Sequence, residues 1–171
     1  MSGNLAHSET LEFPGGEPVS TLTADDRLEI ENLQRLYAQA TDGLGGQDEV
    51  AKAQSLATYE RIFMPNVQIT TSNTGAEPLT ASSPQGWYDV VASALAHYTS
   101  TQHMIGTQVV TGDALGPHLE SYLSAWHFEE DGSVQVFLGT YIDEIVRDGS
   151  TWKIASMNLR HTGSYTLPVR T

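Results

Sequence analysis

The first half of the chain carries apolar residues at helical spacing. The clearest stripe repeats at alternating steps of three and four residues and comprises Ile30, Leu33, Tyr37, Ala40 and Leu44. It predicts a helix that begins at Thr23, a residue type that caps helices, and that ends in the glycine-rich segment 43–46. A second helix is predicted from about Asp48 to Ile62, ended by Pro65, and a third begins at Ser83-Pro84.

In the second half the pattern changes to strands. A short β-branched run at 67–71 already predicts one strand, and residues 72–82 predict a loop. Four further segments alternate or are rich in β-forming residues: 101–111, 119–129, 134–147 and 151–165. Asp131-Gly132 and Asp148-Gly149 lie between the last three and are hairpin signals. This order predicts an α+β fold with helices on one face of a bent antiparallel sheet and a cavity at its open end.

Length and composition predict one domain with a short arm. The chain has 171 residues, of which 39% are hydrophobic and 17% charged, as in ordinary globular proteins. Residues 1–20 show no apolar periodicity and are expected to form a flexible N-terminal arm, which leaves 21–171 as the domain. The first twenty residues lack the basic start and apolar run of a secretory signal, and no apolar stretch approaches the length of a membrane span. We therefore expect a cytoplasmic protein.

Charge and motifs narrow the classes of partner. The formal net charge is −13, from 21 acidic against 8 basic residues, which argues against nucleic acid and membrane surfaces as partners. Cysteine is absent, so thiolate chemistry and disulfides are excluded. No phosphate-binding loop or nucleophile elbow occurs, and no two histidines have ligand spacing on a helix. We therefore expect neither a metal nor an organic cofactor.

Several local sequences, in this order and spacing, resemble the SnoaL-like family of the nuclear transport factor 2-like superfamily. They are Leu36-Tyr37 followed by Asp42, Thr101-Gln102-His103, Gly139 to Asp143, Asp148-Gly149, and Trp152-Lys153-Ile154. The resemblance covers roughly residues 20–165. It implies a cone-shaped α+β barrel in which three helices pack on a strongly curved mixed, mostly antiparallel sheet.

The resemblance also implies a chemistry. Scytalone dehydratase and bile-acid dehydratase, two members of this superfamily, remove water from hydroxylated ring compounds without a cofactor. Bile-acid dehydratase pairs a helix tyrosine and aspartate with a strand histidine, and Tyr37, Asp42 and His103 match these places. Scytalone dehydratase uses a second histidine on the next strand, where this chain has His127.

Other members of the superfamily match less well. Ketosteroid isomerases need an aspartate base just after the first strand, where this chain has Thr71. Limonene-epoxide hydrolases need an aspartate–arginine–aspartate set, and the strand at 119–129 has no arginine. In the lindane dehydrochlorinases an arginine follows the last-strand tryptophan, and Met157 occupies that place here.

The residues can be assigned roles in β-elimination. Histidine titrates near neutrality, so His103 is the candidate general base or acid, with Asp42 as its orienting partner. An aspartate near a helix C-terminus is badly placed for the dipole, and its alternative role is that of a turn residue. His127 follows Trp126 on an alternating strand, so only one of these two side chains faces the cavity.

Tyr37 and His127 are candidates to polarise or protonate the leaving oxygen. Tyr37 also belongs to the apolar stripe, where it is expected to pack in the core. Further candidates for substrate contacts are Tyr59, Trp87, Tyr141 and Asn158. Each of these four has a structural role as its alternative.

Together these residues predict a cofactor-independent lyase of the dehydratase type, acting on a hydrophobic, cyclic, hydroxylated small molecule. Two alternatives remain open. One is a non-catalytic small-molecule-binding or dimerisation domain of the same fold, and the other is an isomerase or polyketide cyclase that uses the same pocket. The resemblance also implies a homodimer or homotrimer.

Overall fold

Three helices and six strands make up the chain in the computed structural model, which describes residues 22–46, 48–72, 77–113 and 115–169. The helices are α1 (Ala24–Leu44), α2 (Glu49–Ile62) and α3 (Pro84–Leu95). The strands are β1 (Phe63–Ser72), β2 (Thr80–Ala81), β3 (Ser100–Asp113), β4 (Gly116–Phe128), β5 (Val134–Asp148) and β6 (Thr151–Leu167). The predicted arm at 1–20 and the centre of the predicted loop at 72–82 lie outside the described residues.

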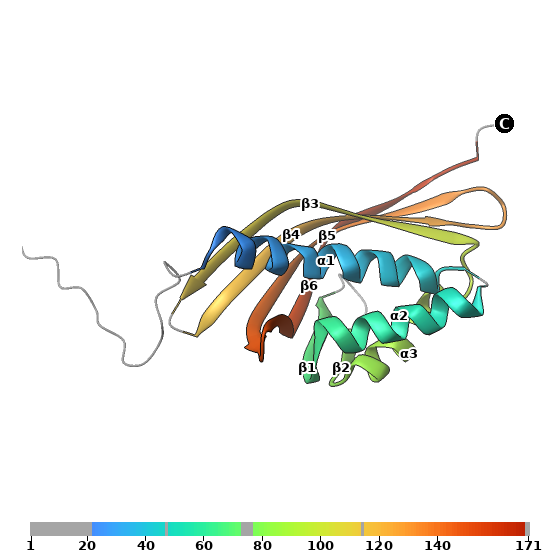
Figure 1. Cartoon of the computed structure of the whole chain (residues 1–171). Coiled ribbons are helices and arrows are strands. Elements are labelled where there is room, and N and C mark those ends of the chain that lie inside the picture. The colour runs from blue at the N-terminus through green and yellow to red at the C-terminus, as the bar shows by residue number, and fades with distance from the viewer. Residues whose placement is uncertain (1–21, 47, 73–76, 114, 170–171) are drawn as a thin grey trace, which may run out of the picture.

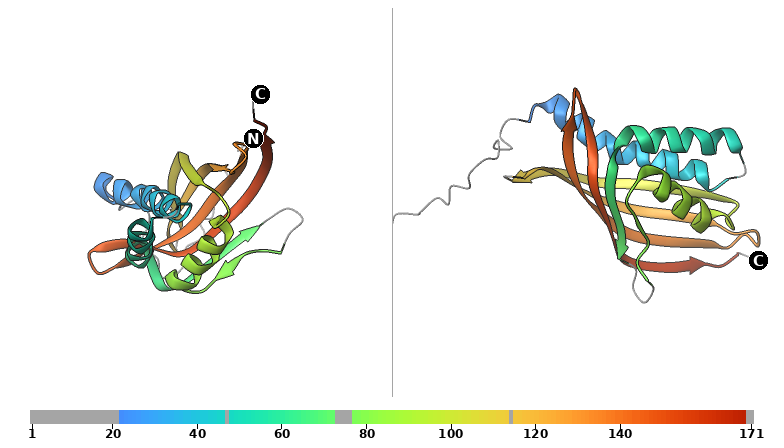
Figure 2. Two further views of the ribbon diagram at one scale, coloured as in Figure 1. Left: turned by 90° about the vertical axis from the view of Figure 1, so that its right-hand side faces the viewer. Right: turned by 90° about the horizontal axis from the view of Figure 1, so that it is seen from below.

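The strands form one open, mixed sheet in the order β2-β1-β6-β5-β4-β3. All neighbours are antiparallel except β1 and β6, which pair in parallel. The sheet curves around the three helices, and α1 runs alongside β3 (Figures 1 and 2). This arrangement confirms the predicted α+β fold, with three helices on a curved and mostly antiparallel sheet.

Polar caps explain where the helices begin. Thr23 accepts a hydrogen bond from the Asp26 amide, and the Asp26 side chain accepts one from the Thr23 amide, which forms a capping box. Asp48 caps α2 by accepting from two amides, and Ser83 caps α3 just before Pro84. The predicted starts at Thr23, Asp48 and Ser83 are therefore confirmed.

The region after α2 differs from the prediction in two ways. The helix ends at Ile62, and β1 begins at once, so Pro65 lies inside a strand instead of ending a helix. Proline fits there because the β1–β6 register shifts between Phe63 and Gln68, where no regular ladder bond is needed. The predicted loop also contains β2, whose two residues pair with β1 and are too short to leave a pattern.

The core lies between the helices and the concave face of the sheet. The predicted α1 stripe is buried there, and Ile30 and Leu44 are 0% and 2% exposed. Ile154 and Met157 from β6 are completely buried on the opposing side. Of the described helices, none combines the length and apolar character needed to cross a membrane.

Candidate functional site

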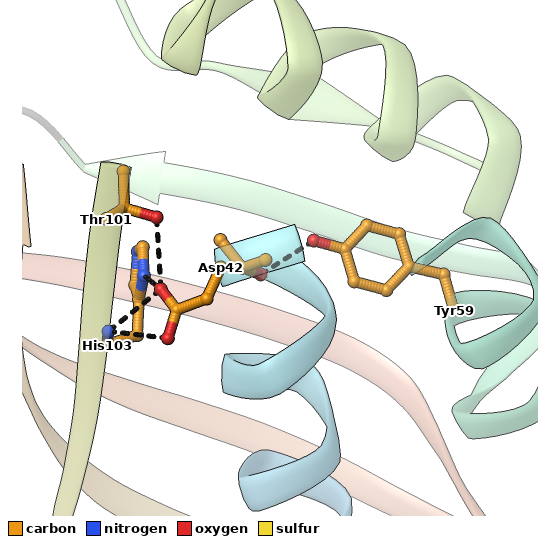
Figure 3. A network of polar contacts seen from close by, with 5 residues as sticks. Asp42, Tyr59, Thr101 and His103 are labelled. Carbon is orange, nitrogen blue, oxygen red and sulfur yellow. Dashed lines mark hydrogen bonds and ion pairs between the residues drawn. The ribbon is translucent and has the colours of Figure 1, made fainter. Parts of the chain in front are cut away.

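The end of α1 meets the start of β3 through Asp42 and His103. The His103 Nδ1 atom lies 2.7 Å from Asp42 Oδ1, and the His103 backbone N–H donates to both carboxylate oxygens at 3.0 and 3.1 Å. The Thr101 hydroxyl donates to Asp42 Oδ1 at 3.0 Å. Figure 3 shows Asp42 at the end of α1 with Thr101 and His103 opposite it on β3. Two predicted partners from distant segments are therefore in direct contact.

The contact determines which nitrogen of His103 carries the proton. An ionised carboxylate only accepts hydrogen bonds, so the Nδ1 atom facing Asp42 must be the donor. In the neutral imidazole, the Nε2 atom then has a free lone pair. The His103 side chain is 7% exposed and lines a cavity, so a basic nitrogen is held in a largely dry site.

His127 lies on the same face of the sheet as His103. It pairs with Thr101 across the β3–β4 ladder, and His103 pairs with Ala125, so these side chains all project toward the helices. The His127 and His103 rings meet edge to face with their centroids 5.5 Å apart. Trp126 therefore faces the other side of the sheet, where its indole N–H donates to Ser124.

The surroundings keep the His127 imidazole uncharged at neutral pH. Burial and, to a lesser extent, the neighbouring His103 together lower its pKa to about 4, although a hydrogen bond to the Gln135 backbone partly opposes the shift. Because one ring N–H is used by that backbone bond, the other nitrogen remains as an acceptor. His127 is therefore better suited to hold a substrate hydroxyl than to protonate one.

Tyr37 sits at the centre of a group of hydroxyls on the helix side. Its oxygen accepts a hydrogen bond from Trp87 Nε1 at 3.1 Å. Burial raises the Tyr37 pKa, although hydrogen bonds from Trp87, Thr41 and Tyr141 oppose this shift. The phenol therefore keeps its proton, which can be donated to an oxygen atom in the cavity.

These side chains open into a cavity of about 330 Å³ between the helices and the sheet. The lining residues are Tyr37, Thr41, Thr71, Leu79, Trp87, Val91, Ala94, Leu95, Tyr98, His103, Leu123, Ala125, His127, Phe137, Tyr141 and Leu159. None of them is lysine, arginine, aspartate or glutamate. A mainly apolar cavity with a few converging polar groups is the usual form of a small-molecule site.

The structure separates the predicted substrate contacts into two groups. Trp87 and Tyr141 line the cavity. Tyr59 is absent from the lining, because it is fully buried behind the end of α1, where its hydroxyl is 2.7 Å from Thr41 Oγ1 (Figure 3). Asn158 lies between the buried Met157 and Leu159 on β6, so alternation directs it to the outer face of the sheet. These positions argue against substrate contacts by Tyr59 and Asn158.

Three polar residues of the site were missed from the sequence. Thr101 binds Asp42, Thr71 lines the cavity, and Tyr98 both lines the cavity and stacks on His127 with ring centroids 4.8 Å apart. Thr101 could have been found, because it lies two residues from His103 and therefore shares its face. The positions of Thr71 and Tyr98 depend on tertiary packing and left no local signal.

A larger hollow of about 520 Å³ lies on the outer face of the sheet, beside residues such as Tyr122, Leu138 and Thr140. Tyr122 is the one titratable residue among those that line it, so we place the chemistry in the helix-side cavity. Within the described part of the chain, no three histidine, aspartate or glutamate residues are grouped to hold a metal ion.

Known proteins share this architecture. A candidate scytalone dehydratase from Novosphingobium aromaticivorans is 16% identical over 85% of this chain and 90% of that chain, with a TM-score of 0.66. The Kfla4162 protein of Kribbella flavida is 23% identical over 82% and 93%, with a TM-score of 0.67. Hexachlorocyclohexane dehydrochlorinase LinA-type3 from Novosphingobium barchaimii is 15% identical over 84% and 90%, also with a TM-score of 0.67. At these levels of sequence identity, the similarities establish a shared fold.

The sequence itself carries a more specific match. No curated protein matches the chain. The family model of the SnoaL-like domain, however, matches residues 22–158, which include both Asp42 and His103. The resemblance seen in the sequence is thereby confirmed, and the protein belongs to the SnoaL-like family.

Proposed function

We propose that this protein is a cofactor-independent lyase that removes water from a hydroxylated, hydrophobic ring compound. The observation that supports this most directly is the 2.7 Å contact between His103 Nδ1 and Asp42, with His103 lining an apolar cavity. A histidine whose ring is oriented by a carboxylate is a suitable general base. The match to the SnoaL-like family model adds support. So does the similarity of the fold to those of a candidate scytalone dehydratase and a hexachlorocyclohexane dehydrochlorinase.

In the proposed reaction, His103 Nε2 takes a proton from a ring carbon of the substrate. The electrons of that C–H bond form the new C=C bond while the neighbouring C–O bond breaks. The departing hydroxyl, which accepts a hydrogen bond from Tyr37, receives the proton from the His103 imidazolium and leaves as water. Asp42 stabilises the imidazolium during this transfer, and His127 holds a second oxygen of the substrate by accepting its hydrogen bond.

The lining of the cavity favours an uncharged substrate. It contains no lysine or arginine to pair with a carboxylate or phosphate, and His127 is uncharged at neutral pH. The net charge of −13 also repels anions before they reach the site. Trp87, Tyr98 and Phe137 offer aromatic walls to a ring.

A screen of uncharged hydroxylated ring compounds tests the proposal. Dehydration is detected by mass spectrometry as a product lighter than the substrate by the mass of one water, about 18 mass units. For a compound that is turned over, His103→Gln should lower kcat by about two to four decades. Asp42→Asn should also lower kcat strongly, because the amide favours the wrong histidine tautomer.

A second histidine–aspartate pair supplies the matched control. His118 Nε2 lies 3.2 Å from Asp113 Oδ2 near the β3–β4 turn, without hydrogen-bond alignment and outside the cavity. His118→Gln and Asp113→Asn should leave kcat unchanged. If a ring compound binds, is never converted, and binds equally well to His103→Gln, the protein is a binding domain and the lyase proposal is wrong. Conversion to a product of unchanged mass would instead identify an isomerase or cyclase.

We also propose that the protein forms a homodimer or homotrimer through the outer face of its sheet. This face bears exposed Met104 and Tyr122, which are 43% and 53% accessible. The hollow beside them is lined without a charged side chain, on a protein that is otherwise strongly acidic. An uncharged apolar patch of this kind is typical of an interaction surface.

A further inference from the structure

Two residues of β3 hold Asp42 in its position: Thr101, which lies outside the cavity lining, and His103, which belongs to it. Thr101 and His103 project from the same face of β3, and both donate to Asp42 Oδ1. Figure 3 shows the two hydrogen bonds meeting at that oxygen. Together with the His103 backbone N–H, which donates to both carboxylate oxygens, these two hydrogen bonds hold the Asp42 carboxylate against β3.

Asp42 needs this support because of where it lies. It is in the last turn of α1, at the negative end of the helix dipole, and that turn contains no basic residue. Its side chain is 29% exposed, so water competes for the carboxylate. The donors on β3 are what turn the carboxylate toward the histidine.

Gly45, just beyond the end of α1, lies directly against Thr101. A Cβ atom on Gly45 would be 2.5 Å from Thr101 Oγ1 and 2.6 Å from Thr101 Cγ2, which is closer than atoms can approach. The Gly45 φ angle is −77°, which any residue adopts. Glycine is therefore required here by space and not by backbone conformation.

We infer that Gly45 and Thr101 are positioning residues for the Asp42–His103 pair. The bare α-carbon of Gly45 lets the Thr101 hydroxyl reach Asp42, and this hydrogen bond fixes the carboxylate against His103 Nδ1. The inference rests on the proposed function for its catalytic meaning, but the geometry itself can be measured without a substrate.

The test follows the His103 Nδ1–H proton by NMR in the full-length, ¹⁵N-labelled protein. Thr101→Val keeps the shape of the side chain and removes the hydroxyl, so exchange of this proton with water should accelerate about tenfold or more. Thr101→Ser keeps the hydroxyl and should restore slow exchange. Gly45→Ala should behave like Thr101→Val, because the added methyl group displaces the hydroxyl.

Gly46 supplies the matched control. A Cβ atom there would meet nothing within 4 Å, so Gly46→Ala should leave the exchange rate unchanged. The double variant Gly45→Ala/Thr101→Val should exchange no faster than either single variant, because both act through one hydrogen bond. Unchanged exchange in Thr101→Val, or multiplied effects in the double variant, would overturn the inference.

Turnover separates this inference from the proposed function. If a substrate is found, Thr101→Val should lower kcat about tenfold to a hundredfold with KM nearly unchanged, since small displacements of a base slow the chemical step. If proton exchange responds as expected but no compound is converted by the wild-type protein, the positioning stands and the lyase proposal fails. If His103 is catalytic but Thr101→Val retains full kcat and slow exchange, the positioning inference fails alone.

Discussion

Asp143 is a fully buried carboxyl group that takes no part in the proposed chemistry. It lies two residues beyond Tyr141 on β5, and its Oδ2 atom is 2.6 Å from Gln34 Nε2. Burial raises the pKa of Asp143 from 3.8 to about 8, although the Gln34 contact opposes the shift. At neutral pH the residue is therefore mainly an uncharged carboxylic acid, the form in which such a group is tolerated in a core.

This shift predicts a pH-dependent stability of unusual sign. Between about pH 4 and 8 the native state keeps a proton that the unfolded chain has lost, so the stability that Asp143 contributes is complete below pH 4 and is lost as the pH rises toward 8. Asp143→Asn removes this titration. The free energy of unfolding of the variant, relative to that of the wild type, should increase by about 1 kcal/mol for each unit that the pH rises across that window. Urea unfolding at pH 5, 6, 7 and 8 measures this difference.

Glu144→Gln is the control for that series. Glu144 is the next residue on β5 and is exposed, so its substitution makes the same change in net charge without altering a buried group. Its unfolding free energy should run parallel to that of the wild type over the same pH range. If the unfolding free energy of Asp143→Asn also ran parallel to that of the wild type, Asp143 would be ionised in the folded protein and the prediction would be wrong.

Among the elements, α1 links the β5–β6 hairpin to the edge strand β3. Its first turn is tied to the β5–β6 hairpin, because Asp26 binds Arg147 and accepts from Trp152 Nε1 at 3.0 Å. The first turn also contacts the edge strand β3, where Arg27 donates to the Val110 carbonyl at 3.1 Å. The end of α1 reaches β3 again through Asp42. Backbone groups at an edge strand are thus covered by a helix instead of another strand.

The crossing of α1 and α2 is set by Gly43. A Cβ atom at this position would lie 2.5 Å from Ser55 Oγ on α2. Alanine is favoured over glycine in helices by up to about 1 kcal/mol, but overpacking costs about 1–3 kcal/mol. Gly43→Ala should therefore lower the midpoint of thermal unfolding. In a Ser55→Ala background, which removes the obstructing oxygen, the same substitution should be neutral or stabilising.

The measurement is the midpoint of thermal unfolding, compared within two pairs of proteins. The first pair is the wild type and Gly43→Ala, and the second is Ser55→Ala and Ser55→Ala/Gly43→Ala. Equal losses in the two backgrounds would mean that Ser55 is not the obstacle. Ser55→Ala is expected to be mild by itself, because the Ser55 hydroxyl donates only to the Ala51 carbonyl of its own helix.

Most element boundaries could be predicted because they depend on local chemistry. Thr23, Asp48 and Ser83 cap helices, and Gly149, with a φ of +62°, occupies the tight turn between β5 and β6. Pro65 misled the prediction, because its tolerance in β1 depends on an irregular register with β6, a strand from the other end of the chain. A contact of that kind leaves no mark on the residues around it.

The site was predictable to a lesser extent. Asp42 and His103 were paired through the family resemblance, since no periodicity relates the end of a helix to a strand far along the chain. The face of His127 depended on the β3–β4 register, which places it opposite Thr101. Trp126 is equally amphipathic, so alternation alone could not choose between them.

For the whole molecule, the proposed self-association predicts a change in mass. The wild-type protein should sediment as a dimer or trimer, because the apolar outer face is covered by another copy. Tyr122→Glu adds a charge to each copy at that face and should convert the protein to a monomer at micromolar concentration. Val50→Glu is the control, because Val50 is 65% exposed on α2, which packs against the opposite side of the sheet.

Analytical ultracentrifugation of the three proteins gives the answer. A wild-type monomer, or an oligomer that Tyr122→Glu leaves intact, would contradict the proposal. Dissociation by Val50→Glu would instead place the interface on the helices.

The parallel pairing of β1 with β6 has a consequence for how the molecule is made. The first pair of the β1–β6 ladder is Phe63 with Ile154, and the last is Ser72 with Arg160. The ladder therefore joins segments from opposite halves of the chain. On the ribosome β1 is synthesised early and must wait for its partner, whereas the hairpins of β3 to β6 close as soon as each strand emerges. Since the cavity has walls from both parts, the nascent protein has no binding site until its final strand has been translated.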